Sequence, residues 1–170
     1  MPTVIDKTRT NPFVGLRPFR SDEGQLFFGR LEQATELLEK LHHTRFLGVI
    51  GSSGCGKSSL IRAGLIPKLK AGFLVSDRSR WRVATLQPGA APLANLAVAL
   101  LAAAEMDEAP VNSQPTPPPP DQVVNLVSAL RRYGAAAAVK LLTPPLGETN
   151  ANLLLLIDQF EELFHFGIDS

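Results

Sequence analysis

The chain has few of the residues that mark disulfide-rich, nucleic-acid-binding or membrane proteins. Its 170 residues include a single cysteine, Cys55, which excludes an internal disulfide. Lys and Arg number 17 against 16 for Asp and Glu, so no charge excess implies nucleic acid. The longest apolar run, residues 93–104, is far shorter than the roughly 20 residues of a membrane span. The first residues lack the layout of a signal peptide. The sequence therefore predicts a cytoplasmic protein without a membrane segment.

Hydrophobic residues make up 45% of the chain, which suits one domain with a packed core. Apolar spacing and turn residues predict strands at 45–50, 80–87 and 153–157. The same patterns predict helices at residues 31–43, 92–104 and 135–142. A further helix should start at Lys57 and bend or end near Pro67, and another should follow an N-cap at Asp121. A last helix should begin within residues 159–164. This alternation predicts an α/β fold with a parallel sheet and helices on both faces.

One motif carries specific chemistry. Residues 51–58 read GSSGCGKS and match G-x-x-x-x-G-K-S/T, between a predicted strand and a predicted helix. Such a loop surrounds a phosphate with backbone N–H groups and the positive end of a helix, and Gly51, Gly54 and Gly56 allow the close approach and the unusual dihedral angles that the loop needs. Lys57 would reach the β- and γ-phosphates, and the Ser58 hydroxyl would bind Mg²⁺. The alternative is a glycine-rich turn that happens to precede a helix. The predicted nucleotide-binding residues of the loop are Gly51, Ser52, Ser53, Gly54, Cys55, Gly56, Lys57, Ser58 and Ser59.

A carboxylate follows the last predicted strand. In P-loop proteins a second strand of the sheet ends in a carboxylate that holds Mg²⁺, and LLLLID places Asp158 in that role. A capping aspartate is the alternative. Glu161 and Glu162 lie just beyond, and one of them could polarise an attacking water as a general base. Glu161 is the better candidate because it lies about one helical turn from Asp158, although both could simply be first-turn helix acids. The predicted catalytic residues are Lys57, Asp158 and Glu161.

Five segments together resemble the STAND class of signalling NTPases, and more narrowly the bacterial novel STAND NTPase domains that are often joined to WD repeats. They are NPFVGLRPFR, FFGR, FLGVIGSSGCGKSSLIRAGLIP, LQPGAAPLANLAVAL and LLLLIDQFEELF. The resemblance implies a P-loop fold of the additional-strand type, ATP as the nucleotide, and a switch that controls oligomerisation. It also implies that Gly29 and Arg30 contact the base or ribose. Arg30 could instead cap the helix that it opens, or form a salt bridge with it.

The predicted organisation is an extended arm at residues 1–20 and a P-loop NTPase domain at 21–170, with a Pro-rich surface loop at 109–120. STAND domains continue past the Asp-bearing strand, and in the additional-strand type the next strand lies between that strand and the P-loop strand. We therefore expect a sheet that is incomplete at its C-terminal end, in a fragment of a longer protein. A split protein with a complementing partner, or direct pairing of the two strands as in kinases and GTPases, are the alternatives.

The predicted function is an ATP- and Mg²⁺-binding module of a STAND-type switch with weak or no hydrolysis of its own. The expected partners are the nucleotide and either a second copy or the remainder of a longer STAND protein. One alternative is a non-catalytic fragment that associates with a full-length relative. Another is a small P-loop kinase, but residues 109–120, the candidate lid, contain no Arg or Lys. No base-reading motif such as Asn-Lys-x-Asp is present to decide ATP against GTP.

Overall fold

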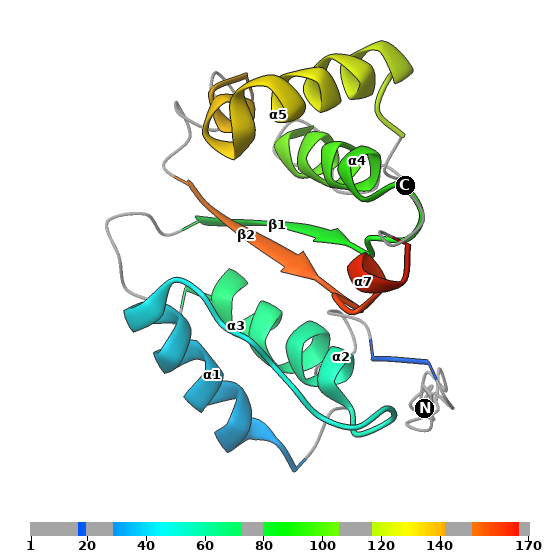
Figure 1. Cartoon of the computed structure of the whole chain (residues 1–170). Coiled ribbons are helices and arrows are strands. Elements are labelled where there is room, and N and C mark those ends of the chain that lie inside the picture. Colours follow the sequence, from blue (N-terminus) through cyan, green and yellow to red (C-terminus); the bar gives the residue numbers. More distant parts are fainter. Residues whose placement is uncertain (1–16, 20–28, 73–79, 106–116, 142–150, 167–170) are drawn as a thin grey trace, which may run out of the picture. The chain divides into compact units, whose positions relative to one another are not determined.

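The computed structural model describes residues 17–19, 29–72, 80–105, 117–141 and 151–166, in two compact units, Met1–Phe73 and Leu74–Ser170 (Figure 1). Most of the predicted arm and of the Pro-rich loop lies outside the described residues. The division into an arm and one domain at 21–170 stays a prediction.

The regular secondary structure described in the first unit is all helical. Helix α1, Leu31–Thr44, is followed by three consecutive helical segments, α2 (Lys57–Ser59), η2 (Leu60–Leu65) and α3 (Ile66–Lys70). The predicted helix at 31–43 is confirmed, and it packs against η2. On its exposed side Lys40 donates a hydrogen bond of 2.6 Å to Glu36, which holds the pKa of that carboxyl below its usual value. The buried side chains of this unit are Ala34, Leu38, Leu41, Leu60, Ile61, Ala63, Leu65, Ile66 and Leu69.

The helix that follows the glycine-rich motif changes type before Pro67. Residues Leu60–Leu65 form a π-helix, and the N–H of Ile66 bonds to the carbonyl of Ile61, five residues back. Proline has no N–H to donate to the carbonyl four residues back, so the regular α pattern cannot pass through Pro67 unchanged. The helix predicted to bend or end near Pro67 instead widens locally to a π-helix and continues to Lys70.

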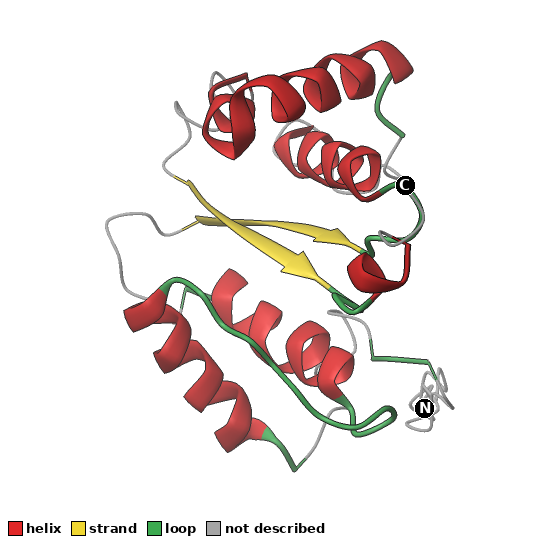
Figure 2. Ribbon diagram, in the orientation of Figure 1, coloured by secondary structure: helices red, strands yellow, loops and turns green. Residues whose placement is uncertain are grey.

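The predicted strand at residues 45–50 is wrong. This segment is coil and begins at Arg45, whose φ is 56° (Figure 2). Phe46 is 82% exposed and Ile50 is 97% exposed, so the apolar run is not buried. The sheet in the described part of the chain contains only two strands, both in the second unit. Direct pairing between this segment and the Asp158 strand stays a prediction.

The second unit contains that sheet. Strands β1 (Arg80–Leu86) and β2 (Ala151–Ile157) pair in parallel, from Arg80 opposite Ala151 to Leu86 opposite Ile157. Helices α4 (Pro92–Glu105) and α5 (Pro120–Leu141) lie between them in the chain, and α7 (Glu162–Phe166) follows β2. The α/β class and the parallel pairing are confirmed. Helices on both faces of the sheet remain a prediction.

Helix α5 consists of two helices. Gly134, with φ 72° and ψ −175°, breaks it, so the separate helix predicted from residue 135 is confirmed. Glycine adopts this positive φ without the steric cost that a side chain would impose. The first helix begins at Pro120, and Asp121 lies in its first turn instead of at the N-cap. This shift of two residues is within the usual uncertainty of helix ends.

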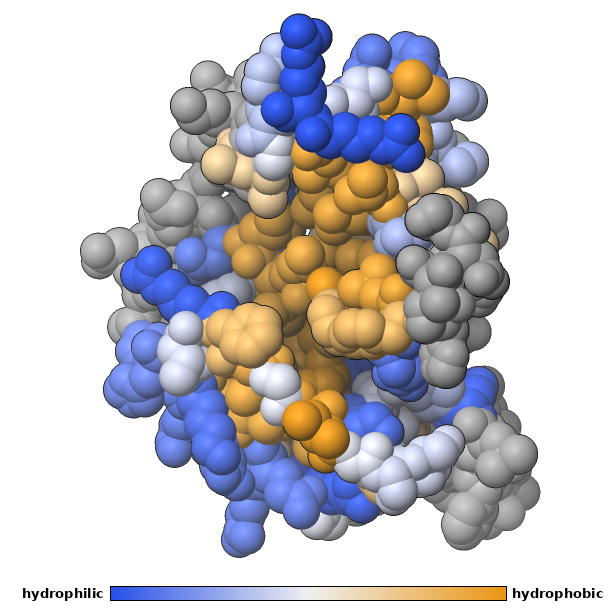
Figure 3. Space-filling model, in the orientation of Figure 1, coloured by the Kyte–Doolittle hydropathy of each residue, from blue (hydrophilic) through white to orange (hydrophobic). Residues whose placement is uncertain are grey.

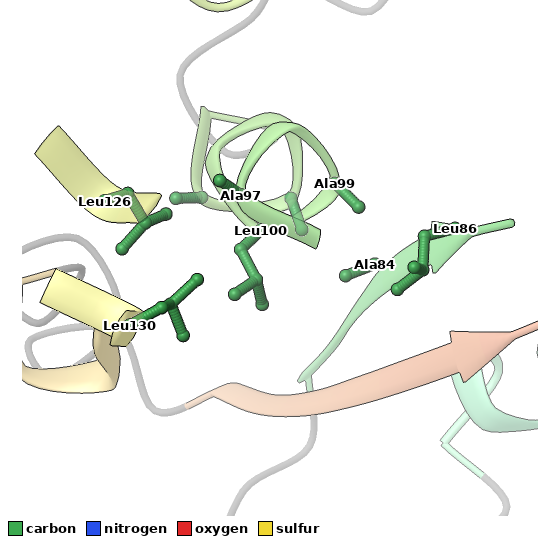
Figure 4. Close-up of a cluster of buried hydrophobic side chains, with 9 residues drawn as sticks. Ala84, Leu86, Ala97, Ala99, Leu100, Leu126 and Leu130 are labelled. Carbon is green, nitrogen blue, oxygen red and sulfur yellow. The ribbon is translucent and has the colours of Figure 1, made fainter. Parts of the chain in front are cut away.

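The core of the second unit lies between β1 and its helices. Leu126 and Leu130 on α5 point toward Ala97 and Leu100 on α4, and β1 contributes Ala84 and Leu86 (Figure 4). One cation is buried here. Arg82 is only 4% exposed and donates a hydrogen bond of 3.1 Å to the carbonyl of Ala104, at the negative C-terminal end of α4. None of the helices in the described ranges is long and apolar enough to cross a membrane.

Several large apolar side chains are exposed, and apolar surface is visible in the space-filling view (Figure 3). In the second unit Leu155 on β2 is 40% exposed. Phe160 and Phe164 are also exposed, and their rings meet edge to face at 6.1 Å. The two-stranded sheet thus leaves apolar surface in contact with solvent.

Candidate functional site

The glycine-rich motif forms an exposed loop that leads directly into α2. Gly54 has a φ of 76° and Gly56 a φ of 88°, a region that residues with a side chain seldom adopt. A Cβ atom on Gly54 would meet nothing within 4 Å, so its requirement for glycine comes from the backbone angle alone. Gly56 is the N-cap residue of α2, and its carbonyl accepts the N–H of Leu60. The sequence expectation that these two glycines adopt unusual dihedral angles is confirmed.

Gly51 is needed for a different reason. Its φ is not positive, but a Cβ atom there would lie 2.9 Å from the Cys55 sulfur, closer than real contacts allow. The Cys55 thiol is half-buried and faces the start of the loop. Cys55 stands at one of the unspecified positions of G-x-x-x-x-G-K-S/T, so the motif does not predict this contact.

Lys57 folds back over its own loop. Its ammonium group donates hydrogen bonds to the carbonyl oxygens of Gly51, at 2.9 Å, and of Ser52, at 3.0 Å. These two bonds hold a positive charge against the motif. Ser52 and Ser53 are exposed in the same loop.

The two serines after Lys57 lie in α2 and are half-buried. The Ser59 hydroxyl accepts a hydrogen bond of 3.2 Å from the backbone N–H of Phe19, in the short described part of the predicted arm. The side chain of Ser59 therefore links that segment to the helix. The predicted roles of Ser58 and Ser59 toward metal and nucleotide stay predictions.

The segment before α1 also reaches the loop. Gly29 has a φ of 84°, and Arg30 follows as the N-cap residue of α1. The Arg30 side chain makes no capping hydrogen bond, and instead its Nη1 donates to the carbonyl oxygen of Cys55 at 2.9 Å. Sequence reasoning missed this contact, since nothing in the local pattern links residues 25 positions apart. Contact of Gly29 and Arg30 with a base or ribose stays a prediction.

Asp158 lies in the second unit, directly after β2. Its backbone N–H donates a hydrogen bond of 2.9 Å to the carbonyl of Leu86, the last residue of β1. Because the strands are parallel, this bond places Asp158 at the carboxyl ends of both, the edge where ligands bind in open α/β sheets. Gln159, with a φ of 58°, then turns the chain away from the sheet.

The two neighbouring glutamates differ in their surroundings. Glu162 opens α7, and its carboxylate accepts a hydrogen bond of 2.9 Å from the N–H of Gly89, in the turn after β1. Asn95 holds the same turn, through bonds to the carbonyls of Gln87 and Pro88. Glu162 thus has a structural role, whereas Glu161 is exposed. The general-base role predicted for Glu161 stays a prediction.

Comparison with protein-family models identifies the family to which the chain belongs. The model of the family described as Novel STAND NTPase 1 matches residues 12–170, which include both the loop and Asp158. The chain belongs to the Novel STAND NTPase 1 family. The resemblance found in the sequence is confirmed, and membership in this NTPase family implies nucleotide binding with a divalent metal. No curated protein and no solved structure matches the chain.

The residues present in this Novel STAND NTPase 1 chain fit such ligands. The ammonium of Lys57 lies against a loop of exposed backbone, where phosphate oxygens can replace the carbonyls of Gly51 and Ser52. The Ser58 hydroxyl and the Asp158 carboxylate are oxygen donors of the kind that Mg²⁺ prefers. The structure describes these two halves in separate compact units.

Proposed function

We propose that the chain is the ATP- and Mg²⁺-binding module of a STAND-type molecular switch. The observation that carries the proposal is the Lys57 ammonium, held on the carbonyls of a loop whose Gly54 and Gly56 adopt positive φ angles. Gly54, Gly56, Lys57, Ser58 and Ser59 would bind the phosphates, and Asp158 would join Ser58 on the metal side.

Binding of the triphosphate exchanges one set of hydrogen bonds for another. Lys57 gives up two neutral carbonyl acceptors and gains charged phosphate oxygens, which form stronger charge-assisted bonds. Backbone N–H groups of the loop and of the first turn of the helix add neutral donors. Bound Mg²⁺ would neutralise part of the phosphate charge.

A pair of lysine substitutions tests this proposal. Lys57→Ala should weaken ATP binding by a factor on the order of ten to a hundred, because it removes a charged hydrogen-bond donor. Lys70→Ala is the matched control, since Lys70 is an exposed residue at the end of α3 and carries the same charge. Isothermal titration calorimetry measures both affinities. Equal ATP affinities of the two variants would contradict the proposal.

We propose further that this chain alone hydrolyses ATP slowly. Glu161 is the candidate for activating water, but the sheet in the described part of the chain contains only β1 and β2. Phosphoryl transfer needs both halves held in a fixed geometry. A phosphate-release assay should give a turnover well below about 1 s⁻¹, the lower end of the common enzyme range. Faster turnover would contradict this view.

A second candidate function is that of an interaction module. Phe46 and Ile50 are almost fully exposed in the first unit, and Leu155 on β2 is exposed in the second. Exposed apolar side chains and unpaired strand edges favour association with further protein. We propose a partner that is either a second copy or the remainder of a longer STAND protein. Sedimentation of the chain with a full-length relative tests this, and a chain that stays monomeric in the mixture rejects it.

A further inference from the structure

Arg30 lies outside the glycine-rich motif but contacts its backbone. The Nη1 atom of Arg30 donates a hydrogen bond of 2.9 Å to the carbonyl oxygen of Cys55. The same Nη1 lies 3.5 Å from the position that a Cβ atom of Gly56 would take. The guanidinium group is therefore packed against the peptide that joins Cys55 to Gly56.

The geometry of this peptide links the position of the Cys55 oxygen to the direction of the Gly56 N–H. In a planar trans peptide the carbonyl oxygen of one residue and the N–H of the next point in opposite directions, and the described chain contains no cis peptide. Fixing the Cys55 oxygen therefore also fixes the direction of the Gly56 N–H. Glycine at position 56 leaves this peptide unusually free to rotate, and its φ of 88° is one of several accessible values. The bond from Arg30 selects one orientation.

We propose that Arg30 is a positioning residue for the phosphate-binding loop. By holding the Cys55 oxygen on one side, it presents the Gly56 N–H on the other side as a donor for a phosphate oxygen. The inference rests on the proposed nucleotide-binding function and deepens it. Gly29 supports the arrangement, since its φ of 84° sets the backbone direction at which Arg30 enters α1.

The first test uses the ligand-free protein. In ¹H–¹⁵N spectra of the full chain, Arg30→Met should shift the amide resonance of Gly56, and Arg30→Lys should restore much of it, because an ammonium group also donates to a carbonyl. Arg45→Met is the matched control, since Arg45 is an exposed residue at the end of α1 whose backbone N–H bonds to the Leu41 carbonyl but whose side chain makes no hydrogen bond to the described residues. A Gly56 amide that is unchanged by Arg30→Met overturns the inference.

The second test measures binding of ATP and of inorganic tripolyphosphate, which has neither base nor ribose. Loss of the positioning contact should weaken both by a similar factor of roughly ten, in line with a charge-assisted hydrogen bond. A loss for ATP with no loss for tripolyphosphate identifies a base or ribose contact and overturns the inference. Arg30→Gln, which is too short to reach the Cys55 oxygen from the same backbone position, is the second variant if Arg30→Met lowers the unfolding midpoint.

The two proposals fail in different ways. Wild-type protein that binds neither ATP nor tripolyphosphate overturns the proposed function and this inference together. Wild-type protein that binds both, with the same affinities in Arg30→Met, overturns the inference alone and leaves the proposed function standing.

Discussion

Gly51 and Cys55 constrain each other within the glycine-rich loop. The space that a Cβ atom on Gly51 would need is taken by the Cys55 sulfur, 2.9 Å away. The backbone angle at Gly51 does not itself require glycine, because its φ is not among the positive values. The constraint is therefore one of packing, and a second substitution can relieve it.

We predict that Gly51→Ala lowers the affinity for ATP only slightly, because the new methyl group must displace the Cys55 sulfur, which is the end of a flexible side chain. Overpacking of this kind costs about 1–3 kcal/mol in well-packed sites, and this exposed loop should lie at the low end. The double variant Gly51→Ala/Cys55→Ala should recover most of the loss. A calorimetric double-mutant cycle measures the coupling, and strictly additive effects would reject the steric explanation.

At the scale of elements, Glu162 joins the start of α7 to the turn between β1 and α4. Its carboxylate accepts the N–H of Gly89, which would otherwise lose its partner in a partly buried turn. Glu161, one residue earlier, is exposed and lies before the helix. Of these two adjacent glutamates, Glu162 therefore has a structural role and Glu161 is the candidate for the catalytic one.

We predict that Glu162→Ala lowers the free energy of unfolding by about 1–2 kcal/mol, the usual cost of removing a charged acceptor from a backbone N–H. Glu161→Ala should change it by less than about 0.5 kcal/mol, as expected for an exposed site. Urea denaturation of the two variants beside wild type provides the measurement. Equal stability losses would show that the bond to Gly89 contributes nothing specific.

The sequence predicts elements well where a periodic apolar pattern meets a clear end signal. Helix α4 begins at the predicted Pro92, and β1 ends within one residue of the predicted boundary before Pro88. Strand β2 begins two residues earlier than predicted. The signals that mark these elements lie within their own residues, and β1 and β2 also supply each other's ladder.

Residues 45–50 show where local reading fails. Their apolar side chains suit a buried strand, yet a strand exists only if another strand supplies the ladder. The structure describes these residues as coil, with Phe46 and Ile50 exposed. The contact of Arg30 with Cys55 is missed for a related reason, because it depends on tertiary structure that no short pattern records.

For the whole molecule, the family match covers the loop and Asp158 together, whereas the structure describes them in separate units. The match to Novel STAND NTPase 1 covers residues 12–170, whereas the structure resolves two compact units with one half of the candidate site in each. The loop with Lys57 belongs to the first unit and Asp158 to the second. The proposed function requires that Lys57 and Asp158 both serve one bound nucleotide and its metal.

Calorimetric titration of ATP with and without Mg²⁺, into wild type and Asp158→Asn, tests this claim most directly. Wild type should bind ATP more tightly with Mg²⁺ than without it, because a carboxylate and a hydroxyl are available to the metal. Asp158→Asn should keep the metal-free affinity, which depends on the Lys57 loop, and lose the increase that Mg²⁺ provides. A wild type that does not bind ATP, or an Asp158→Asn variant with the full Mg²⁺ effect, would contradict the account.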